Sequence, residues 1–105
     1  MPLFRKSKDK ERKEYIDFLQ KLSSACDLCL QYSEKTDHHL RVQILCDDVK
    51  YFIPFENEDI KHIDSKISKV LDDLKILLYT NRDPYRVQAK LDELEMLIKE
   101  RSSKE

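Results

Sequence analysis

The chain contains no glycine, although average usage would place about seven in a chain of 105 residues. Glycine supplies the positive-φ corners of tight turns and the close backbone approaches that many ligand sites need. Its absence excludes the Walker phosphate loop, the dinucleotide-binding fingerprint and the nucleophile elbow. The sequence therefore favours helices joined by ordinary turns, and it excludes functions more readily than it identifies one.

Length and charge indicate one domain covering residues 1–105, with a mixed-charge surface. The 20 Lys and Arg residues nearly balance the 21 Asp and Glu residues, which is typical of solvated helix faces. No apolar run approaches the roughly 20 residues that span a bilayer, and the basic start lacks the apolar stretch of a secretory signal. Three cysteines are an odd count, so we expect reduced thiols and a cytoplasmic protein.

Apolar residues recur at steps of three and four in separate stretches, which predicts amphipathic helices. The clearest stripe follows Ile60, Ile63, Ile67, Val70, Leu74 and Leu77. The phase of the pattern breaks in the polar run of residues 33–39, which predicts a turn there. The predicted helices cover residues 9–34, 38–53, 58–80 and 84–101.

Capping residues and prolines support four of these boundaries. Thr36 or Asp37 is expected to cap the second helix, and Pro54 to end it by disfavouring helical geometry at the preceding residue. Asn57 is a favourable N-cap for the third helix. Asp83 and Pro84 form a helix start, a capping carboxylate followed by proline at the first helical position.

Short connections favour antiparallel neighbours, so the sequence predicts an all-α fold, an antiparallel up-down-up-down four-helix bundle. The alternative is that the heptads of the third helix pair between two chains in a homodimer. The flanking residues Leu71 and Leu78 broaden that helix's apolar seam, which favours a globular core over a two-stranded zipper.

Three cysteines and two histidines raise the question of a zinc site: Cys26, Cys29, His38, His39 and Cys46. Each cysteine, however, falls on the apolar stripe of its helix, where a small thiol acts as a core hydrophobe. A second paired knuckle is missing as well. We therefore expect core packing, with no bound metal and no reactive thiol.

The sequence contains no recognisable catalytic grouping. The acidic pairs Asp47-Asp48 and Asp72-Asp73 fall on polar helix faces, and the Glu-x-x-His ligands of di-iron bundles are missing. The histidines accompany no identifiable nucleophile. We expect neither an enzyme nor a cofactor.

The N-terminal arm, residues 1–13, is rich in cations: Arg5, Lys6, Lys8, Lys10, Arg12 and Lys13. The first apolar stripe begins only at Tyr15, so the arm should overhang the bundle. A frayed, solubilising terminus is the simpler interpretation. The alternative is contact with an anionic membrane or a nucleic-acid backbone.

One end of the predicted bundle gathers the residues that suit a protein interface. The N-termini of the second and fourth helices meet there, and the surrounding residues are His38, His39, Arg41, Tyr79, Arg82, Tyr85 and Arg86. Tyrosine and arginine are common interface anchors, and helix N-termini add hydrogen-bond donors. The simpler interpretation is a polar bundle end without function.

These observations favour a small interaction or regulatory module that binds a protein of unknown identity through that end. The runner-up is a peripheral binder of membrane or nucleic-acid anions that uses the arm. Salt dependence separates the two, because counterion release would weaken the second steeply.

Overall fold

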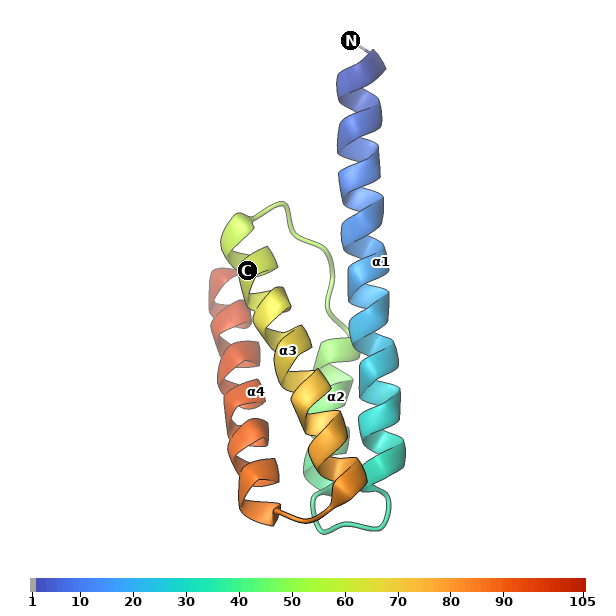
Figure 1. Ribbon diagram of the computed structural model, residues 1–105. Helices are drawn as coiled ribbons and strands as arrows, with labels where there is room; N and C mark the ends of the chain where they lie inside the picture. The colour runs from blue at the N-terminus through green and yellow to red at the C-terminus, as the bar shows by residue number, and fades with distance from the viewer. Residues whose placement is uncertain (1) are drawn as a thin grey trace.

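The computed structural model describes the backbone of residues 2–105 and the side chains from Lys10 onward. Four helices make up almost all of it (Figure 1): α1 (Pro2–Ser33), α2 (His39–Lys50), α3 (Glu58–Thr80) and α4 (Pro84–Lys104). No strand occurs between residues 2 and 105, so the all-α four-helix fold is confirmed.

The helices alternate in direction along the chain, with α1 and α3 running opposite to α2 and α4 (Figure 1). Helix α1 packs on α2 and α3, and α4 packs on α3 and α2. Within residues 2–105, α2 and α3 are not backbone neighbours, so they lie on a diagonal of the bundle. The fold is thus a pair of helical hairpins, α1–α2 and α3–α4, joined by the segment 51–57. We expected each helix to pack on the next one in the sequence, but α2 and α3 do not pack on each other.

The predicted boundaries of α3 and the start of α4 are confirmed, because each is set by a local cap. Asn57 Oδ1 accepts hydrogen bonds from the backbone N–H groups of Asp59 (2.8 Å) and Ile60 (3.2 Å). Asp83 Oδ1 accepts from the N–H of Arg86 (3.1 Å), with Pro84 as the first residue of the helix. These bonds satisfy N–H groups that have no partner within the helix.

The boundaries of α2 differ from prediction. The N-cap is His38, without a side-chain cap, so the expectation of Thr36 or Asp37 was wrong. The Thr36 hydroxyl instead donates to the carbonyl of Ser33 (2.9 Å) and accepts from the N–H of His38 (3.2 Å), which closes the turn before the helix. At its other end α2 stops at Lys50, three residues before the predicted end, and the chain crosses toward α3.

Helix α1 begins at Pro2, not near residue 9, and therefore includes most of the segment that we expected to fray. Its first turns project beyond the other three helices (Figure 1). Helix α4 continues to Lys104, three residues past its predicted end. The carboxylate of Glu105 accepts a 2.7 Å hydrogen bond from Arg101, four residues earlier, and this bond stabilises the last helical turn.

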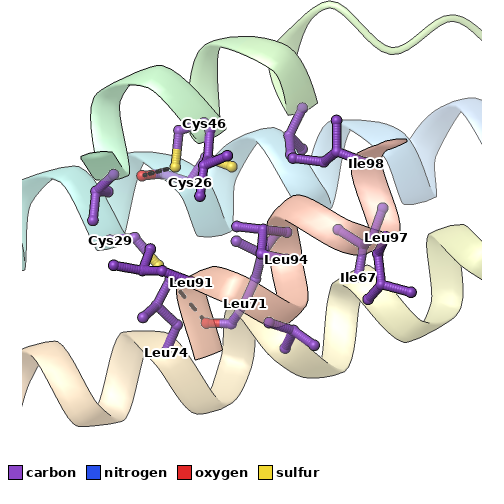
Figure 2. Close-up of a cluster of buried hydrophobic side chains, with 14 of the residues drawn as sticks. Cys26, Cys29, Cys46, Ile67, Leu71, Leu74, Leu91, Leu94, Leu97 and Ile98 are labelled. Carbon is purple, nitrogen blue, oxygen red and sulfur yellow. Dashed lines mark hydrogen bonds between the residues drawn. The ribbon is translucent and has the colours of Figure 1, made fainter. Parts of the chain in front are cut away.

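All four helices contribute to one hydrophobic core (Figure 2). The three cysteines are fully buried in it and free of disulfides, which confirms the prediction that they pack as core residues. The Cys29 thiol is directed at the carbonyl of Leu71, and the Cys46 thiol at the carbonyl of Cys26. The fully buried apolar residues around them include Leu22, Val42, Ile67, Leu71, Leu74, Leu91 and Leu94.

We expect the burial of these thiols to make the fold sensitive to alkali. Burial and the neighbouring Cys46 raise the pKa of Cys29 to about 12, and a hydrogen bond with Cys46, together with burial, raises the pKa of Cys26. An unfolded thiol titrates near pH 8.5. Above that pH the unfolded chain releases protons that the folded chain retains, so stability falls by about 1.4 kcal/mol per pH unit for each thiol.

Urea unfolding between pH 8 and pH 10.5 measures this slope. A Cys26→Ala/Cys29→Ala variant has a lower starting stability because it lacks two core sulfurs, but its slope should be shallower than that of the parent. Equal slopes for the two proteins would contradict the assignment.

Candidate functional site

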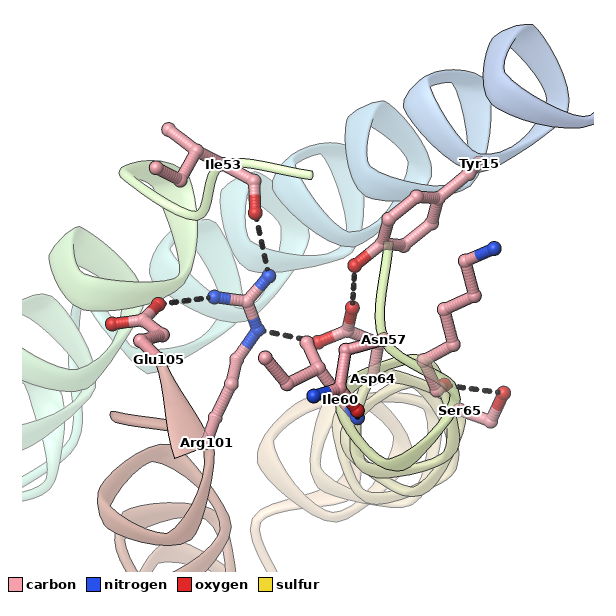
Figure 3. A network of polar contacts seen from close by, with 9 residues as sticks. Tyr15, Ile53, Asn57, Ile60, Asp64, Ser65, Arg101 and Glu105 are labelled. Atoms are coloured by element: carbon pink, nitrogen blue, oxygen red, sulfur yellow. Dashed lines mark hydrogen bonds and ion pairs between the residues drawn. The ribbon is translucent and has the colours of Figure 1, made fainter. Parts of the chain in front are cut away.

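The most extensive polar network of the described side chains lies between the first half of α3 and the C-terminal turn of α4, and it joins three helices (Figure 3). The Asp64 carboxylate on α3 accepts from the Tyr15 hydroxyl of α1 (2.6 Å) and from Arg101 Nε of α4 (2.7 Å). Arg101 also donates to the carbonyl of Ile53 (2.8 Å) and to Glu105 (2.7 Å). The Arg101 guanidinium thus forms hydrogen bonds with α3, with the segment 51–57 and with the C-terminal turn.

The electrostatics of this network are those of a structural ion pair. Burial alone lowers the pKa of Arg101, but the hydrogen bond and charge of Asp64 outweigh it, so that pKa is raised. Burial, followed by the hydrogen bond to Asp64, raises the pKa of Tyr15. Among the described side chains every buried polar nitrogen or oxygen has a hydrogen-bond partner. The buried atoms of the network are all paired within the protein, which favours a structural role over ligand binding.

Aromatic rings complete the surroundings of Arg101. Its guanidinium carbon lies 4.0 Å from the centroid of the Phe52 ring and 5.7 Å from that of Phe55. Both distances are within the range of cation–π attraction. The connection between the two hairpins is therefore held by Arg101 as well as by the chain itself.

The predicted binding end is only partly assembled by the fold. The turn 35–38 meets Asn81 and Pro84 around a shallow hollow of about 270 Å³, so His38 does approach the start of α4. His39 is half-buried, and its Nδ1 lies 2.8 Å from Ser33 Oγ. Arg41 instead forms ion pairs with Asp92 and Glu95 on the side of α4.

The remaining members of the predicted end, Tyr79, Arg82, Tyr85 and Arg86, are exposed. Tyr79 belongs to α3, Arg82 to the turn, and the other two to the first turn of α4. Two of them, Tyr79 and Arg86, also border shallow grooves on the outer side of α3.

These grooves border a surface that we call the Ile76 surface, in which an isoleucine and two tyrosines adjoin two cations. Its residues are Tyr32, Lys75, Ile76, Tyr79 and Arg86. One groove, of about 310 Å³, lies between α1 and α3 and is lined by Tyr32, Lys75, Ile76 and Tyr79. The other, of about 520 Å³, lies between α3 and α4 and is lined by Asp73, Ile76, Leu77, Arg86, Ala89, Lys90 and Glu93. Ile76 lines both and forms the ridge between them.

Two large side chains of this surface are well exposed: Ile76 by 59% and Tyr79 by 72%. The Tyr79 ring meets the Tyr32 ring edge to face, with centroids 5.1 Å apart. This geometry is favourable for aromatic pairs. The surface therefore presents an apolar ridge beside a pair of aromatic rings.

Tyr79 and Arg86 were predicted from the sequence as binding residues, whereas Tyr32, Lys75 and Ile76 were not. The available signal was Ile76, two residues past Leu74 and thus on the opposite side of the helix from the buried seam. An isoleucine out of phase with its seam, three residues before an exposed tyrosine, marks an apolar spot on a polar face. The contribution of Tyr32 required knowing that α1 and α3 are neighbours.

The basic residues of the arm divide into two groups. Lys10, Arg12 and Lys13 are exposed in the N-terminal part of α1. The side chains of Arg5, Lys6 and Lys8 lie outside the described residues. At the nearby start of α3, Lys61 lies within 4 Å of both Glu56 (3.9 Å) and Glu58 (3.8 Å), so those acids have a local partner.

No three His, Cys, Asp or Glu side chains among the described residues are arranged to hold a metal ion. The cysteine sulfurs face the core and backbone carbonyls, whereas His38 lies beside Asn81 and Pro84 at the start of α4. We expect metal-replete protein to contain no stoichiometric zinc by elemental analysis, and EDTA to leave the melting temperature unchanged. One zinc per chain would overturn this expectation.

Between residues 2 and 105, none of the four helices has the length and apolar character that crossing a membrane requires. Comparisons of the chain with protein-family models, with curated proteins and with solved structures found no match.

Proposed function

We propose that this chain is a cytoplasmic helical-bundle module that binds another protein and catalyses no reaction. The observation that carries the proposal is the Ile76 surface, where exposed apolar and aromatic side chains adjoin two grooves at neighbouring helix junctions. Tyrosine and arginine contribute large contact areas and planar hydrogen bonding, and they are enriched among residues that dominate binding energy. The free, buried thiols fit a reducing compartment.

The size of the surface favours a transient interaction. Five residues on three helices make a small patch, and weak signalling contacts bury less than about 1,200 Å² in total. The remainder of α3's outer face carries Lys66, Lys69 and Asp72, which are exposed charges of the kinds depleted from interface cores. Binding energy should therefore concentrate on Ile76 and Tyr79.

Site-specific photo-crosslinking in the native host tests the proposal. A photoreactive phenylalanine analogue in place of Tyr79 should yield a discrete covalent adduct with another protein. The matched control places the same analogue at Met96, which is equally exposed (71%) on the polar face of α4. Adducts at neither position, or the same adducts at both, would contradict binding through this surface.

Charge reversal at the turn between α3 and α4 and at the start of α4 provides a second test. An Arg82→Glu/Arg86→Glu variant should lose most of the adduct formed at position 79, because Arg86 belongs to the surface and Arg82 lies in the turn three residues after Tyr79. Neither side chain forms an ion pair within residues 10–105, so the helical spectrum and melting temperature should stay nearly unchanged. An undiminished adduct would show that these arginines lie outside the contact.

A second candidate function rests on the N-terminal part of α1. Its exposed Lys10, Arg12 and Lys13 favour contact with the phosphates of a membrane surface or a nucleic acid. Such binding should fall steeply between 50 and 200 mM salt and disappear when residues 1–13 are removed. Loss of host-protein capture on that deletion, with the double arginine variant unaffected, would place this function first.

A further inference from the structure

We propose that a second copy of this chain binds in a groove between α1 and α3, through the first eight residues of its own α1. The two copies exchange these segments about a twofold axis, which gives a closed homodimer. The groove and the Ile76 surface lie at opposite ends of α3, so the inference goes beyond the proposed function. It depends on an excess of acids in the groove, on the basic segment that precedes it in the chain, and on the course of α1.

The groove, of about 410 Å³, carries more negative than positive charge. The charged residues that line it are three acids, Glu11, Glu14 and Glu58, and one cation, Lys61. Lys61 is shared between two acids, since it lies 3.9 Å from Glu56 and 3.8 Å from Glu58. Within residues 10–105 neither Glu11 nor Glu14 forms an ion pair. The groove therefore favours a basic ligand.

The other cations of the N-terminal part of α1 leave this excess in place. Lys10, Arg12 and Lys13 are exposed, and none of them lines the groove. Arg12 and Lys13 are one or two residues from each acid, a spacing that places side chains on different sides of a helix. Lys10 shares a side with Glu14, four residues later, but the two form no ion pair.

The first eight residues of the chain have the complementary chemistry. They contain three cations and no acid, together with the apolar residues Leu3 and Phe4. The groove offers an apolar contact as well, because the half-buried Phe18 lines it. Opposite charges that meet across an interface favour association and fix the register of the partners.

A chain cannot place this segment in its own groove. Helix α1 is continuous from Pro2 to Ser33, and its first turns project beyond the other three helices (Figure 1). The helix itself therefore carries the segment away from Glu11 and Glu14. An antiparallel second copy can reach the groove, and twofold symmetry forms both contacts at once.

The sequence of the arm is self-complementary in this arrangement. In an antiparallel pair of α1 helices centred between residues 9 and 10, residues equally far from the centre lie opposite one another. Three of the four pairs of charged residues formed in this way have opposite signs: Arg5 with Glu14, Lys8 with Glu11, and Asp9 with Lys10. The fourth pair joins two cations, Lys6 and Lys13, and Lys13 lies outside the groove.

Sedimentation equilibrium of the full chain tests the proposal. The mass should rise from one chain to two with increasing concentration, and added salt should weaken the dimer because the acids of the groove are exposed. Removal of residues 1–8 should leave a monomer that keeps its helical spectrum. A chain that stays monomeric up to millimolar concentration, or a dimer that survives the deletion, would overturn the proposal.

Charge reversal in the groove then assigns the contact. Glu11→Lys/Glu14→Lys should raise the dissociation constant of the dimer at least tenfold, because cations then face cations. The matched control is Asp47→Lys/Asp48→Lys, which reverses two exposed acids on α2, outside the groove. The control should change the dissociation constant less than threefold. Equal losses in the two variants would contradict the assignment.

A mixture of two variants tests whether the segments are exchanged. Arg5→Glu/Lys8→Glu should also weaken the dimer at least tenfold, because its segment becomes acidic. Mixed with Glu11→Lys/Glu14→Lys it should form a heterodimer, since its acidic segment meets the basic groove and the reverse contact keeps its native charges. Restored association would also show that both variants are folded. A mixture that stays monomeric would overturn the exchange.

The outcomes separate this dimer from the functions proposed above. A monomeric chain that binds phosphatidylserine vesicles through residues 1–13 would support the second candidate function and overturn this inference. A dimer that shows the predicted charge dependence, while crosslinking at position 79 captures nothing, would support this inference and contradict binding through the Ile76 surface.

Discussion

Leu74→Asp should unfold the protein. Leu74 is fully buried in the middle of α3, within the core to which all four helices contribute (Figure 2). The change removes a buried leucine, which costs about 2–5 kcal/mol, and adds a carboxyl group with no partner in an apolar site. Small domains have only about 5–15 kcal/mol of stability in total, so the loss is comparable to the whole.

Far-ultraviolet circular dichroism and thermal melting measure the effect. The matched control is Ile76→Asp, the same new residue two positions along the same helix. Ile76 is 59% exposed, so that variant should stay within about 0.5 kcal/mol of the parent. A Leu74→Asp protein that melts like its control would show that this side of α3 does not face the core.

Arg101→Ala should destabilise the fold by about 3–5 kcal/mol, since it leaves the fully buried Asp64 carboxylate without its cation. The same change frees the carbonyl of Ile53 and removes the guanidinium from the Phe52 and Phe55 rings. Urea denaturation gives the free energy of unfolding. Fluorescence of a probe on the segment 51–57 should report loosening of that segment.

Two controls isolate the buried pair. Arg41→Ala removes an arginine from ion pairs with exposed acids, Asp92 and Glu95, and should cost no more than about 1 kcal/mol. An Asp64→Leu/Arg101→Met protein removes both charges and should be more stable than Arg101→Ala, because no unpaired buried charge remains. If Arg101→Ala costs as little as Arg41→Ala, the network contributes little to the fold.

The sequence predicted the elements whose boundaries depend on neighbouring residues. Asn57 and Asp83 cap the helices that follow them, so the limits of α3 and the start of α4 could be found from a few residues. The end of α2 was predicted three residues too late. Beyond it the carbonyl of Ile53 accepts a hydrogen bond from Arg101, 48 residues away along the chain, and such a distant partner cannot be found from neighbouring residues.

The sequence also carries a signal for the buried network of Asp64 and Arg101. Asp64 lies four residues after Ile60 and three before Ile67, so it occupies a position on the buried seam of α3. Arg101 follows Leu97 by four residues and is likewise on the seam of α4. An acid and a base on the apolar stripes of two helices predict a buried pair, although the partners can be matched only once the neighbours are known.

The candidate surface was harder to predict for a related reason. Tyr32 and Tyr79 form a pair only because α1 and α3 are neighbours, which alternating direction alone does not require. Arg41 has the composition of an interface residue, yet its guanidinium is occupied by acids of α4. Sequence composition identifies residues suited to binding, and packing decides which of them remain accessible.

The pairing of two hairpins across a diagonal connection has a consequence for how the molecule unfolds. Each hairpin leaves one apolar side open, and that side is covered only by the other hairpin. We expect neither hairpin to keep its helices once the two separate, because most helical stability in proteins comes from the packing of an apolar face. Denaturation should therefore be a single cooperative transition, with both hairpins melting at one temperature and no half-folded species accumulating.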